Sequence, residues 1–207
     1  MQILAHRGYW KQETEKNTLA AIGRAFENGY GIETDLRDYN GRLVVSHNVA
    51  DSTCPDAEEL FKLYRSYGKD LPLALNVKAD GIQGLLKKLF DKYDIKNYFM
   101  FDMSVPEQVM YVAQKFNTFT RQSEFEQSPS MYEDCCGVWM DEFSKDWILS
   151  DSVRLHLQNG KRIGVISSEI HKRPQERLWK LLSDFKSDDN LMLCTDIPKE
   201  AEKYFYG

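Results

Sequence analysis

The feature that most constrains the fold is a regular alternation of short apolar runs with segments of helical pattern along the whole chain. Runs such as residues 3–5 and 162–167 are too short for helices and suit buried strands. The segments between them, for example residues 56–67, carry apolar residues at helical spacing and are followed by a glycine. Strands that alternate with helices in this way predict an α/β fold with a parallel sheet.

Eight strand-led units can be counted, apart from one further run that belongs to a hairpin. The predicted strands are residues 3–5, 31–37, 71–78, 98–103, 118–121, 137–140, 162–167 and 191–195. Asn40-Gly41 is typical of a tight turn and predicts a small β-hairpin, closed by residues 43–45, after the second strand. Eight units in 207 residues predict a single domain, residues 1–207, built as a closed (β/α)8 TIM barrel. An open doubly wound sheet is the alternative, although Gly8 alone does not make the glycine-rich turn common after its first strand.

Composition and charge exclude several classes of function. The net charge of −5 does not favour a nucleic-acid partner, and no apolar run approaches the roughly 20 residues that span a bilayer. His6 and Arg7 interrupt the place where a signal segment would be apolar, and the four cysteines lack zinc-binding spacing. We therefore expect reduced thiols in a cytoplasmic protein without stable membrane insertion. The oligomeric state stays open.

Polar or ionisable residues end every predicted strand. In chain order they are His6 and Arg7, Glu33 and Asp35, Asn76 and Lys78, Asp102, Arg121, Asp141, Glu169 with His171, and Asp196. In a parallel barrel all these ends meet at one mouth, where the chemistry of such barrels is found. Strand-to-helix turns are polar in many proteins, so a purely structural role for Asp102, Asp141 or Asp196 taken singly stays open. The convergence predicts a polar site at the mouth.

Glu33 and Asp35 are the pair that a structural role explains least. Because they lie two residues apart on a strand, both side chains project to the same face. Their charges repel there, at a cost that burial increases and a divalent cation removes. Oxygen ligands favour Mg²⁺ or Ca²⁺ over softer metals, so we expect one such ion as a cofactor.

Two histidines can meet at the same mouth. His6 ends the first strand, and His47 follows the hairpin that folds back from the strand with the two acids. A pair of imidazoles suits acid–base catalysis on a phosphodiester, one taking the proton of the attacking oxygen and one protonating the leaving oxygen. Arg7 and Lys78 carry charge that can neutralise the phosphoryl oxygens.

These residues belong to an ordered set of motifs. The chain carries His6-Arg7-Gly8, Asn17-Thr18-Leu19, Glu33-Thr34-Asp35, Gly41-x-Leu-Val-Val-Ser-His47 and Thr195-Asp196-x-Pro198. In order and spacing these motifs resemble the glycerophosphodiester phosphodiesterase family, most densely over residues 3–48. The resemblance implies a (β/α)8 barrel with a catalytic divalent cation and a small-molecule phosphodiester substrate. It also implies metal ligation by Glu33 and Asp35, catalysis by His6 and His47, and phosphate binding by Arg7 and Lys78.

The chain departs from the family pattern in ways that affect the site. Most members carry a further glutamate ligand two residues before the strand lysine, where this chain has Asn76, whose carbonyl can coordinate but brings no charge. The acids that could replace that charge are Asp102, Glu124, Glu126 and Asp141. Residues 49–68 are too few for the family's cap over the substrate, which implies a more open mouth. Candidate substrate contacts there are Arg121, Trp139, His171 and Arg173. A core or barrel-lid position for Trp139, and a solvated or salt-bridge role for Arg121 and Arg173, stay open.

Three functional hypotheses follow. The leading one is a metal-dependent phosphodiesterase that cleaves a glycerophosphodiester-like, polysaccharide-linked or nucleotide-linked phosphodiester through a cyclic phosphate intermediate. The first alternative is a catalytically weakened anion-binding barrel, a pseudoenzyme whose metal site Asn76 has impaired. The second is a lyase or transferase that stops at the cyclic phosphate. Both His6 and His47 are present, which favours an enzyme, because an anion-binding module needs no acid–base pair.

Overall fold

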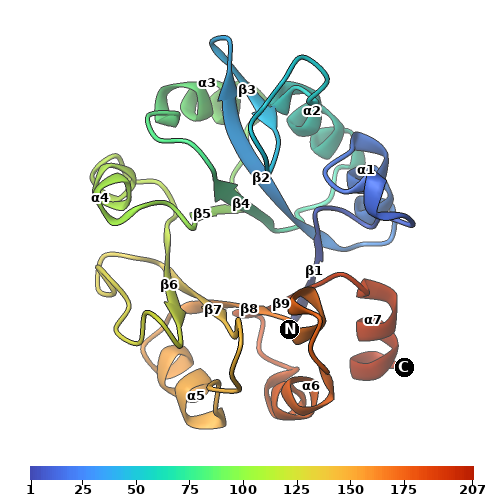
Figure 1. Ribbon diagram of the computed structural model, residues 1–207, viewed down its shortest axis with the longest axis vertical. Coiled ribbons are helices and arrows are strands. Elements are labelled where there is room, and N and C mark those ends of the chain that lie inside the picture. Colours follow the sequence, from blue (N-terminus) through green and yellow to red (C-terminus); the bar gives the residue numbers. More distant parts are fainter.

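The computed structural model describes residues 1–207 and contains eight parallel strands arranged in a ring, with the helices outside it (Figure 1). The strands are β1 (Gln2–His6), β2 (Gly31–Tyr39), β3 (Arg42–Val45), β4 (Leu73–Val77), β5 (Tyr98–Phe101), β6 (Phe119–Ser123), β7 (Gly137–Asp141), β8 (Arg162–Ile166) and β9 (Leu191–Thr195). The helices are α1 (Leu19–Glu27), α2 (Ala57–Tyr67), α3 (Gln83–Tyr93), α4 (Val105–Ala113), α5 (Ser150–Gln158), α6 (Glu176–Leu182) and α7 (Pro198–Tyr206). This arrangement confirms the predicted α/β barrel.

The ring is closed at one seam by a single bridge. Strands pair in the order β5-β4-β2-β1-β9-β8-β7-β6, and β3 pairs antiparallel with β2 alone. Between the two ends of this order, Met100 and Thr118 form a parallel bridge, and the Met100 N–H donates to the Asn117 carbonyl at 2.8 Å. Because the first and last strands of the order meet, the alternative of an open doubly wound sheet is excluded.

Local signals explain the beginnings of the first helix and of the hairpin. Asn17 has a φ of 62°, so α1 begins only after it, at Leu19, and the Thr18 hydroxyl accepts from the Ala21 N–H at 3.2 Å. Asn40 and Gly41 both have positive φ, 49° and 77°, as the tight turn between β2 and β3 requires. The predicted hairpin is therefore confirmed.

One of the eight units has no helix. The chain between β6 and β7, residues 124–136, is irregular. The Gln108 side chain on α4 holds it in place by donating to the Ser130 carbonyl at 3.1 Å. This leaves the rim beside β6 to be built by loop residues alone.

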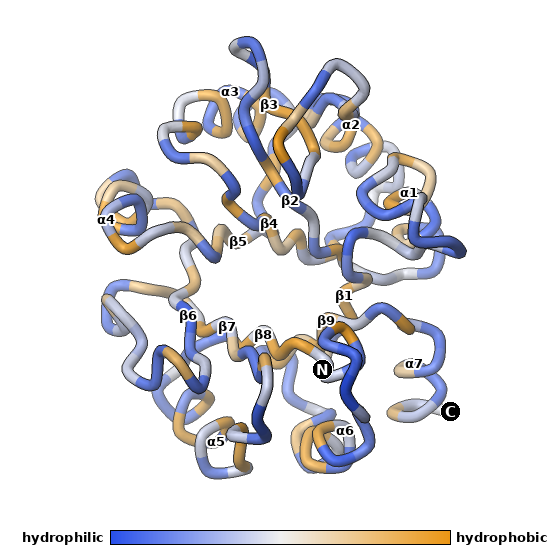
Figure 2. The backbone as a smooth tube through the Cα atoms, viewed as in Figure 1, coloured by the Kyte–Doolittle hydropathy of each residue, from blue (hydrophilic) through white to orange (hydrophobic).

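The barrel interior is filled by an apolar cluster, here called the barrel plug. Its members are Leu4, Ala74, Phe99, Phe101, Phe119, Trp139, Ile166, Met192 and Cys194. They alternate along the strands with residues that pack outward, where a larger apolar cluster fills the space between sheet and helices. Figure 2 shows hydrophobic residues along the strands and hydrophilic residues prominent in the connecting loops.

Glycines make room for the aromatic rings of the barrel plug. A Cβ atom at Gly137 would overlap the Phe119 ring, and one at Gly164 would overlap the Trp139 ring. The Phe99 and Phe119 rings stack with centroids 3.8 Å apart, and those of Phe101 and Trp139 lie 4.0 Å apart. A few large rings facing glycines therefore close the barrel beneath its mouth. None of the helices outside the barrel has the length and apolar content needed to cross a membrane.

Replacement of Gly164 tests this packing. We expect Gly164→Ala to lower the free energy of unfolding by about 1–3 kcal/mol, because the added methyl group overpacks against Trp139. Urea unfolding checks this, with Gly84→Ala as the matched control. Gly84 lies exposed in α3 with open space around its Cβ position, so alanine there should be neutral or stabilising. Equal effects of the two substitutions would contradict the packing.

The buried His156 on α5 makes stability depend on pH. Its ring lies 2.9 Å from the Tyr132 hydroxyl and 2.8 Å from Gln122 Oε1. Burial, with the nearby charge of Lys161, lowers the pKa of His156 below its ordinary value of 6.5. Below that value the unfolded chain gains a proton that the folded chain resists, so the stability contributed here is lost as the pH falls.

We expect the wild type to lose more stability than His156→Gln between about pH 7.5 and pH 5.5, because glutamine cannot take up the proton. Thermal unfolding of both proteins at the two pH values measures the loss. The comparison is of each protein with itself, so any fixed cost of the substitution cancels. Identical losses would contradict this prediction, because they would mean that the pKa of His156 is the same in the folded and the unfolded chain.

Candidate active site

A layer of polar side chains lies directly above the barrel plug. These side chains face inward, because on each strand they sit two residues beyond another inward-facing residue. They are His6, Glu33, Asp35, Asn76, Arg121, Asp141 and Asp196. The strand register aligns Glu33 with His6 and Asp35 with Asn76. Sequence positions that lie far apart are thus brought to one mouth.

His6 is held between two carboxylates. Its Nδ1 lies 2.6 Å from Asp196 Oδ1, and its Nε2 lies 3.8 Å from Glu33 Oε2. Burial opposes ionisation of Asp196, but the hydrogen bond and charge of His6 outweigh it and lower the pKa of Asp196. An ionised carboxylate only accepts hydrogen bonds, so Nδ1 carries the hydrogen and Nε2 of the neutral ring has the free lone pair.

Arg7 lies on a strained turn that follows β1. Its φ is 56°, and the next residue, Gly8, has a φ of 88°. A Cβ atom at Gly8 would lie 2.8 Å from the backbone of Ala21, so no other residue fits between this turn and α1. The Arg7 N–H donates to the Glu33 carbonyl at 2.9 Å, and its own carbonyl accepts from the Asn17 N–H at 2.9 Å. These bonds fix the arginine at the mouth.

Asp35 is the most buried acid of the site and is surrounded by donors. Asn17 Nδ2 donates to Asp35 Oδ2 at 2.8 Å, and Arg7 Nε lies 3.3 Å from the same oxygen. Lys78 Nζ lies 3.6 Å from Asp35 Oδ1. The Asn17 side chain is itself held, because its Oδ1 accepts from the Thr34 hydroxyl at 2.8 Å. Asp35 therefore links both predicted phosphate-binding cations.

Glu33 carries an uncompensated electrostatic cost. Burial and the charge of Asp35 raise the pKa of Glu33 above the ordinary value for a glutamate, and the nearby charges of His6, Arg7 and Lys78 only partly oppose this. Its side chain is 3% exposed, so water cannot supply the missing stabilisation. The carboxylate is available for a positive ligand.

The donor atoms at the mouth fit a hard divalent cation. Seven buried side-chain atoms in the structure have no hydrogen-bond partner, and three of them are Glu33 Oε2, Asp35 Oδ1 and Asn76 Oδ1. They are the oxygens of the three predicted ligands. Oxygen donors of this kind are those that Mg²⁺ and Ca²⁺ take in proteins. The structure contains no group of three His, Cys, Asp or Glu side chains placed to hold a metal. The three unpartnered oxygens come from two carboxylates and one amide.

The acids considered as replacements for the missing charge at Asn76 are all engaged elsewhere. Asp102 and Glu126 both pair with Arg121, and Asp141 pairs with His171. Glu124 accepts three backbone N–H bonds from the loop after β7. All four candidate carboxylates therefore have partners other than Asn76.

Lys78 and Arg121 are connected across the mouth, because both form ion pairs with Asp102. Lys78 Nζ lies 3.4 Å from Asp102 Oδ2, and Arg121 contacts the other Asp102 oxygen. The Arg121 Nε–H donates to Glu126 Oε2. Arg121 was expected to contact substrate; here two carboxylates occupy it, and its side chain remains one-third exposed.

Trp139 lies in the core, which the sequence left open as the alternative to substrate contact. Its side chain belongs to the barrel plug and is 3% exposed. The alternation of β7 places Asp141, two residues later, at the mouth instead. Trp139 therefore closes the barrel floor and is corrected from a substrate contact to a core residue.

His171 lies on the far side of the mouth, in the short 3₁₀ turn after β8. Its Nε2 is 2.6 Å from Asp141 Oδ1. This hydrogen bond raises the pKa of His171, while burial raises the pKa of Asp141. The hydrogen bond to Asp141 thus connects His171 to the polar layer, although His171 is not itself on a strand.

His47 reaches the mouth through the hairpin. The Ser46 N–H donates to the Asp35 carbonyl at 3.0 Å, which fixes the neighbouring His47 at the rim. Its imidazole is exposed, and its Nδ1 lies 3.1 Å from Asn48 Oδ1. In contrast to His6, it has no carboxylate partner that fixes its orientation.

Glu169 is a residue of the site to which the sequence assigned no role. Its carboxylate accepts from the Thr195 hydroxyl at 2.5 Å and from the Asp196 N–H at 3.1 Å. It thereby fixes the turn that presents Asp196 to His6. The only sequence signal was its position at a strand end, because its partners lie 26 and 27 residues away.

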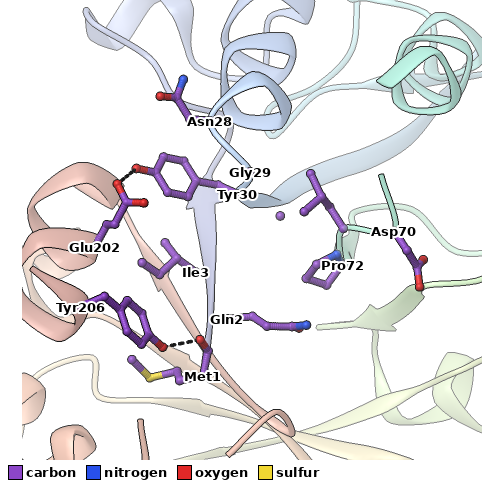
Figure 3. A pocket seen from close by; sticks show the side chains of 12 residues that line it. Met1, Gln2, Ile3, Asn28, Gly29, Tyr30, Asp70, Pro72, Glu202 and Tyr206 are labelled. Carbon is purple, nitrogen blue, oxygen red and sulfur yellow. Dashed lines mark hydrogen bonds between the residues drawn. The ribbon is translucent and has the colours of Figure 1, made fainter. Parts of the chain in front are cut away.

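The cavity drawn in Figure 3 lies at the opposite end of the barrel, where β1, β2 and β4 begin. It encloses about 280 Å³. Tyr206 closes one side by donating to the Met1 carbonyl at 2.5 Å, and Tyr30 donates to Glu202 at 2.8 Å. It contains none of the residues of the polar layer, so the C-terminal mouth remains the candidate site.

Comparisons with known proteins bear on the fold. No protein-family model matches the chain, and no curated protein does. Solved structures do match it. A candidate glycerophosphodiester phosphodiesterase from Galdieria sulphuraria is similar with a TM-score of 0.81 at 19% identity, covering 100% of this chain and 98% of that one.

Two further solved structures agree. A glycerophosphodiester phosphodiesterase from Parabacteroides distasonis has a TM-score of 0.73 at 18% identity, covering 99% of this chain and 96% of that one. A phosphodiesterase from Oleispira antarctica, in complex with its product sn-glycerol-3-phosphate, has a TM-score of 0.73 at 16% identity, covering 100% and 97%. Over its whole length, this chain therefore has the fold of the glycerophosphodiester phosphodiesterases.

Proposed function

We propose that the protein is a glycerophosphodiester phosphodiesterase, a metal-dependent hydrolase of small phosphodiesters with a hydroxyl next to the ester. The observation that carries this proposal is the set of three unpartnered buried oxygens on Glu33, Asp35 and Asn76, beside a carboxylate-held His6. The solved structures with the same fold are described as phosphodiesterases, which supports the proposal. One of them is a complex with sn-glycerol-3-phosphate.

His6 is suited to act as the general base. Its Nδ1 hydrogen points to Asp196, so Nε2 is free to take the proton of the attacking hydroxyl. Asp196 then stabilises the imidazolium that forms, without itself taking a proton. Glu169 holds Asp196 in place for this role.

His47 is the remaining imidazole at the rim and would give a proton to the leaving oxygen. Its imidazole is exposed and has no carboxylate partner, so the ring is free to turn toward a bound substrate. The open mouth lets it approach the leaving group once substrate is bound.

The phosphate is positioned by charge. Arg7 and Lys78 both lie beside Asp35, and their positive charges can contact non-bridging phosphoryl oxygens. Glu33, Asp35 and Asn76 would hold one Mg²⁺ or Ca²⁺, which, when bound, neutralises the charge that develops on the phosphoryl group. Burial of all three donors keeps water from competing with the substrate.

The reaction then has two stages. The neighbouring hydroxyl forms an O–P bond as the P–O bond to the leaving alcohol breaks, with one proton moving to His6 and one coming from His47. The product of this stage is a cyclic phosphate and the free alcohol. Water then opens the ring by the reverse proton transfers and restores both histidines. A lyase would release the cyclic phosphate instead, and phosphorus NMR of the product distinguishes the two.

Charge changes at the metal ligands test the proposed cation site. We expect Glu33→Gln to abolish the rise in melting temperature that Mg²⁺ or Ca²⁺ produces, and to abolish chelator-sensitive turnover. Asn76→Asp adds the missing carboxylate and should increase cation affinity. Glu59→Gln, an exposed position on α2, is the matched control. A cation response in Glu33→Gln equal to that of the wild type would refute the site.

Alanine substitutions test the two histidines. His6→Ala and His47→Ala should each lower kcat/KM on glycerophosphodiesters by about 10²- to 10⁴-fold, the usual contribution of a positioned acid or base. The melting temperature of each variant shows whether the fold is retained. Wild-type rates in both folded variants would refute the acid and base roles of the two histidines, and absence of turnover in the wild type as well would favour the anion-binding alternative.

A further inference from the structure

Two phenylalanine side chains stand exposed at the same rim as the candidate active site. Phe125 is 74% exposed and follows the end of β6 by two residues; Phe143 is 39% exposed and follows β7 in the same way. In a parallel barrel both positions lie at the C-terminal mouth. Large apolar side chains left in water beside a polar site indicate a binding surface.

The two rings continue into the mouth through His171, and the three residues together are called the aromatic row. The Phe125 and Phe143 centroids are 6.1 Å apart, and the Phe143 and His171 centroids are 5.1 Å apart. At its inner end His171 is bonded to Asp141 of the polar layer. The row therefore leads from solvent to the site.

The aromatic row is held in position by the loops that carry it. Glu124, the residue before Phe125, accepts backbone N–H bonds from Phe143 at 3.2 Å and from Ser144 at 2.6 Å. Burial works against ionisation of this carboxylate, but these bonds outweigh it and lower the pKa of Glu124 to about 2. The loop after β6 is thereby fixed to the loop after β7 without any apolar side chain covering the rings.

The charged side chains of the polar layer that lie nearest the aromatic row already have partners. Arg121 is bound by Asp102 and Glu126, and His171 is bound by Asp141. The cations Arg7 and Lys78 lie on the other half of the mouth, where both contact Asp35. A substrate whose phosphate lies on that half would place an uncharged part over the row.

The shape of the aromatic row favours a flat group. Neighbouring rings are tilted to one another by 43° and 47°, so the row offers separate ring faces and not a continuous channel for an alkyl chain. Such faces bind planar groups by offset or edge-to-face packing. The two halves of the mouth thus differ in chemistry, one cationic and one aromatic.

Building on the proposed phosphodiesterase function, we propose that the aromatic row binds the leaving alcohol of the substrate and selects an uncharged, ring-bearing alcohol. The phosphate then lies toward Arg7 and Lys78, and the leaving group extends toward Phe143. Small polar alcohols would lack this contact and react less efficiently.

Matched substrates test the aromatic row. Glycerol 3-(benzyl phosphate) and glycerol 3-(ethyl phosphate) release alcohols of similar acidity that differ in the ring. We expect the wild type to have the higher kcat/KM for the benzyl ester, and Phe125→Ala and Phe143→Ala to lower the benzyl-to-ethyl ratio by about 3- to 10-fold, the value of one aromatic contact. Leu155→Ala, an exposed position on the outer face of α5, is the control and should not change the ratio.

The outcomes separate the two proposals. Turnover of both esters with a ratio that neither phenylalanine substitution changes overturns the role of the aromatic row and leaves the phosphodiesterase function standing. An equal loss on both esters also overturns it, because selection of the ring requires a larger loss on the benzyl ester. Failure of the wild type to hydrolyse either ester, with Mg²⁺ or Ca²⁺ present, overturns both proposals.

Discussion

The crowding of two buried carboxylates at the barrel mouth is the constraint on which the rest of the site depends. Glu33 and Asp35 face the same side of β2, and the floor beneath them is apolar. Their repulsion is relieved by Arg7, Lys78 and the Asn17 amide around Asp35, but Glu33 keeps a raised pKa. A barrel that only needed stability would replace such a pair with apolar residues. The pair has unpartnered oxygens, which is the arrangement that the proposed cation would complete.

The barrel plug explains why burial of the Glu33 and Asp35 carboxylates keeps a high cost in free energy. Phe99, Phe101, Phe119 and Trp139 fill the interior directly below the polar layer, and glycines on neighbouring strands leave space for two of the rings. Water is therefore excluded from beneath the acids, and the low polarity of the floor strengthens every interaction above it. Backbone strain lies at the same level, since Arg7, Asn17 and Asp102 all have positive φ. Packing of the barrel maintains these conformations.

The mouth has two halves of different character. On the β1, β2 and β4 side, unpartnered oxygens lie beside cations. On the β6, β7 and β8 side, Arg121 and Asp141 of the polar layer have partners and aromatic rings are exposed. The missing helix after β6 contributes to this division, because the irregular segment in its place carries Phe125 to the rim. Asp102 joins the halves by contacting both Lys78 and Arg121.

By itself, the sequence determined the alternation of strands and helices, the hairpin at Asn40-Gly41 and the grouping of polar residues at strand ends, because these depend on local periodicity and turn chemistry. It could not place Trp139 inside the barrel, since whether an aromatic residue at a strand end lies in the core depends on the alternation of the whole strand and on glycines of its neighbours. Nor could it show that Asp196 holds His6 or that Glu169 holds Asp196, since those partners are 190 and 27 residues apart. Such contacts exist only once the ring of strands closes, so the tertiary structure alone decided which polar residues are paired and which remain free for a ligand.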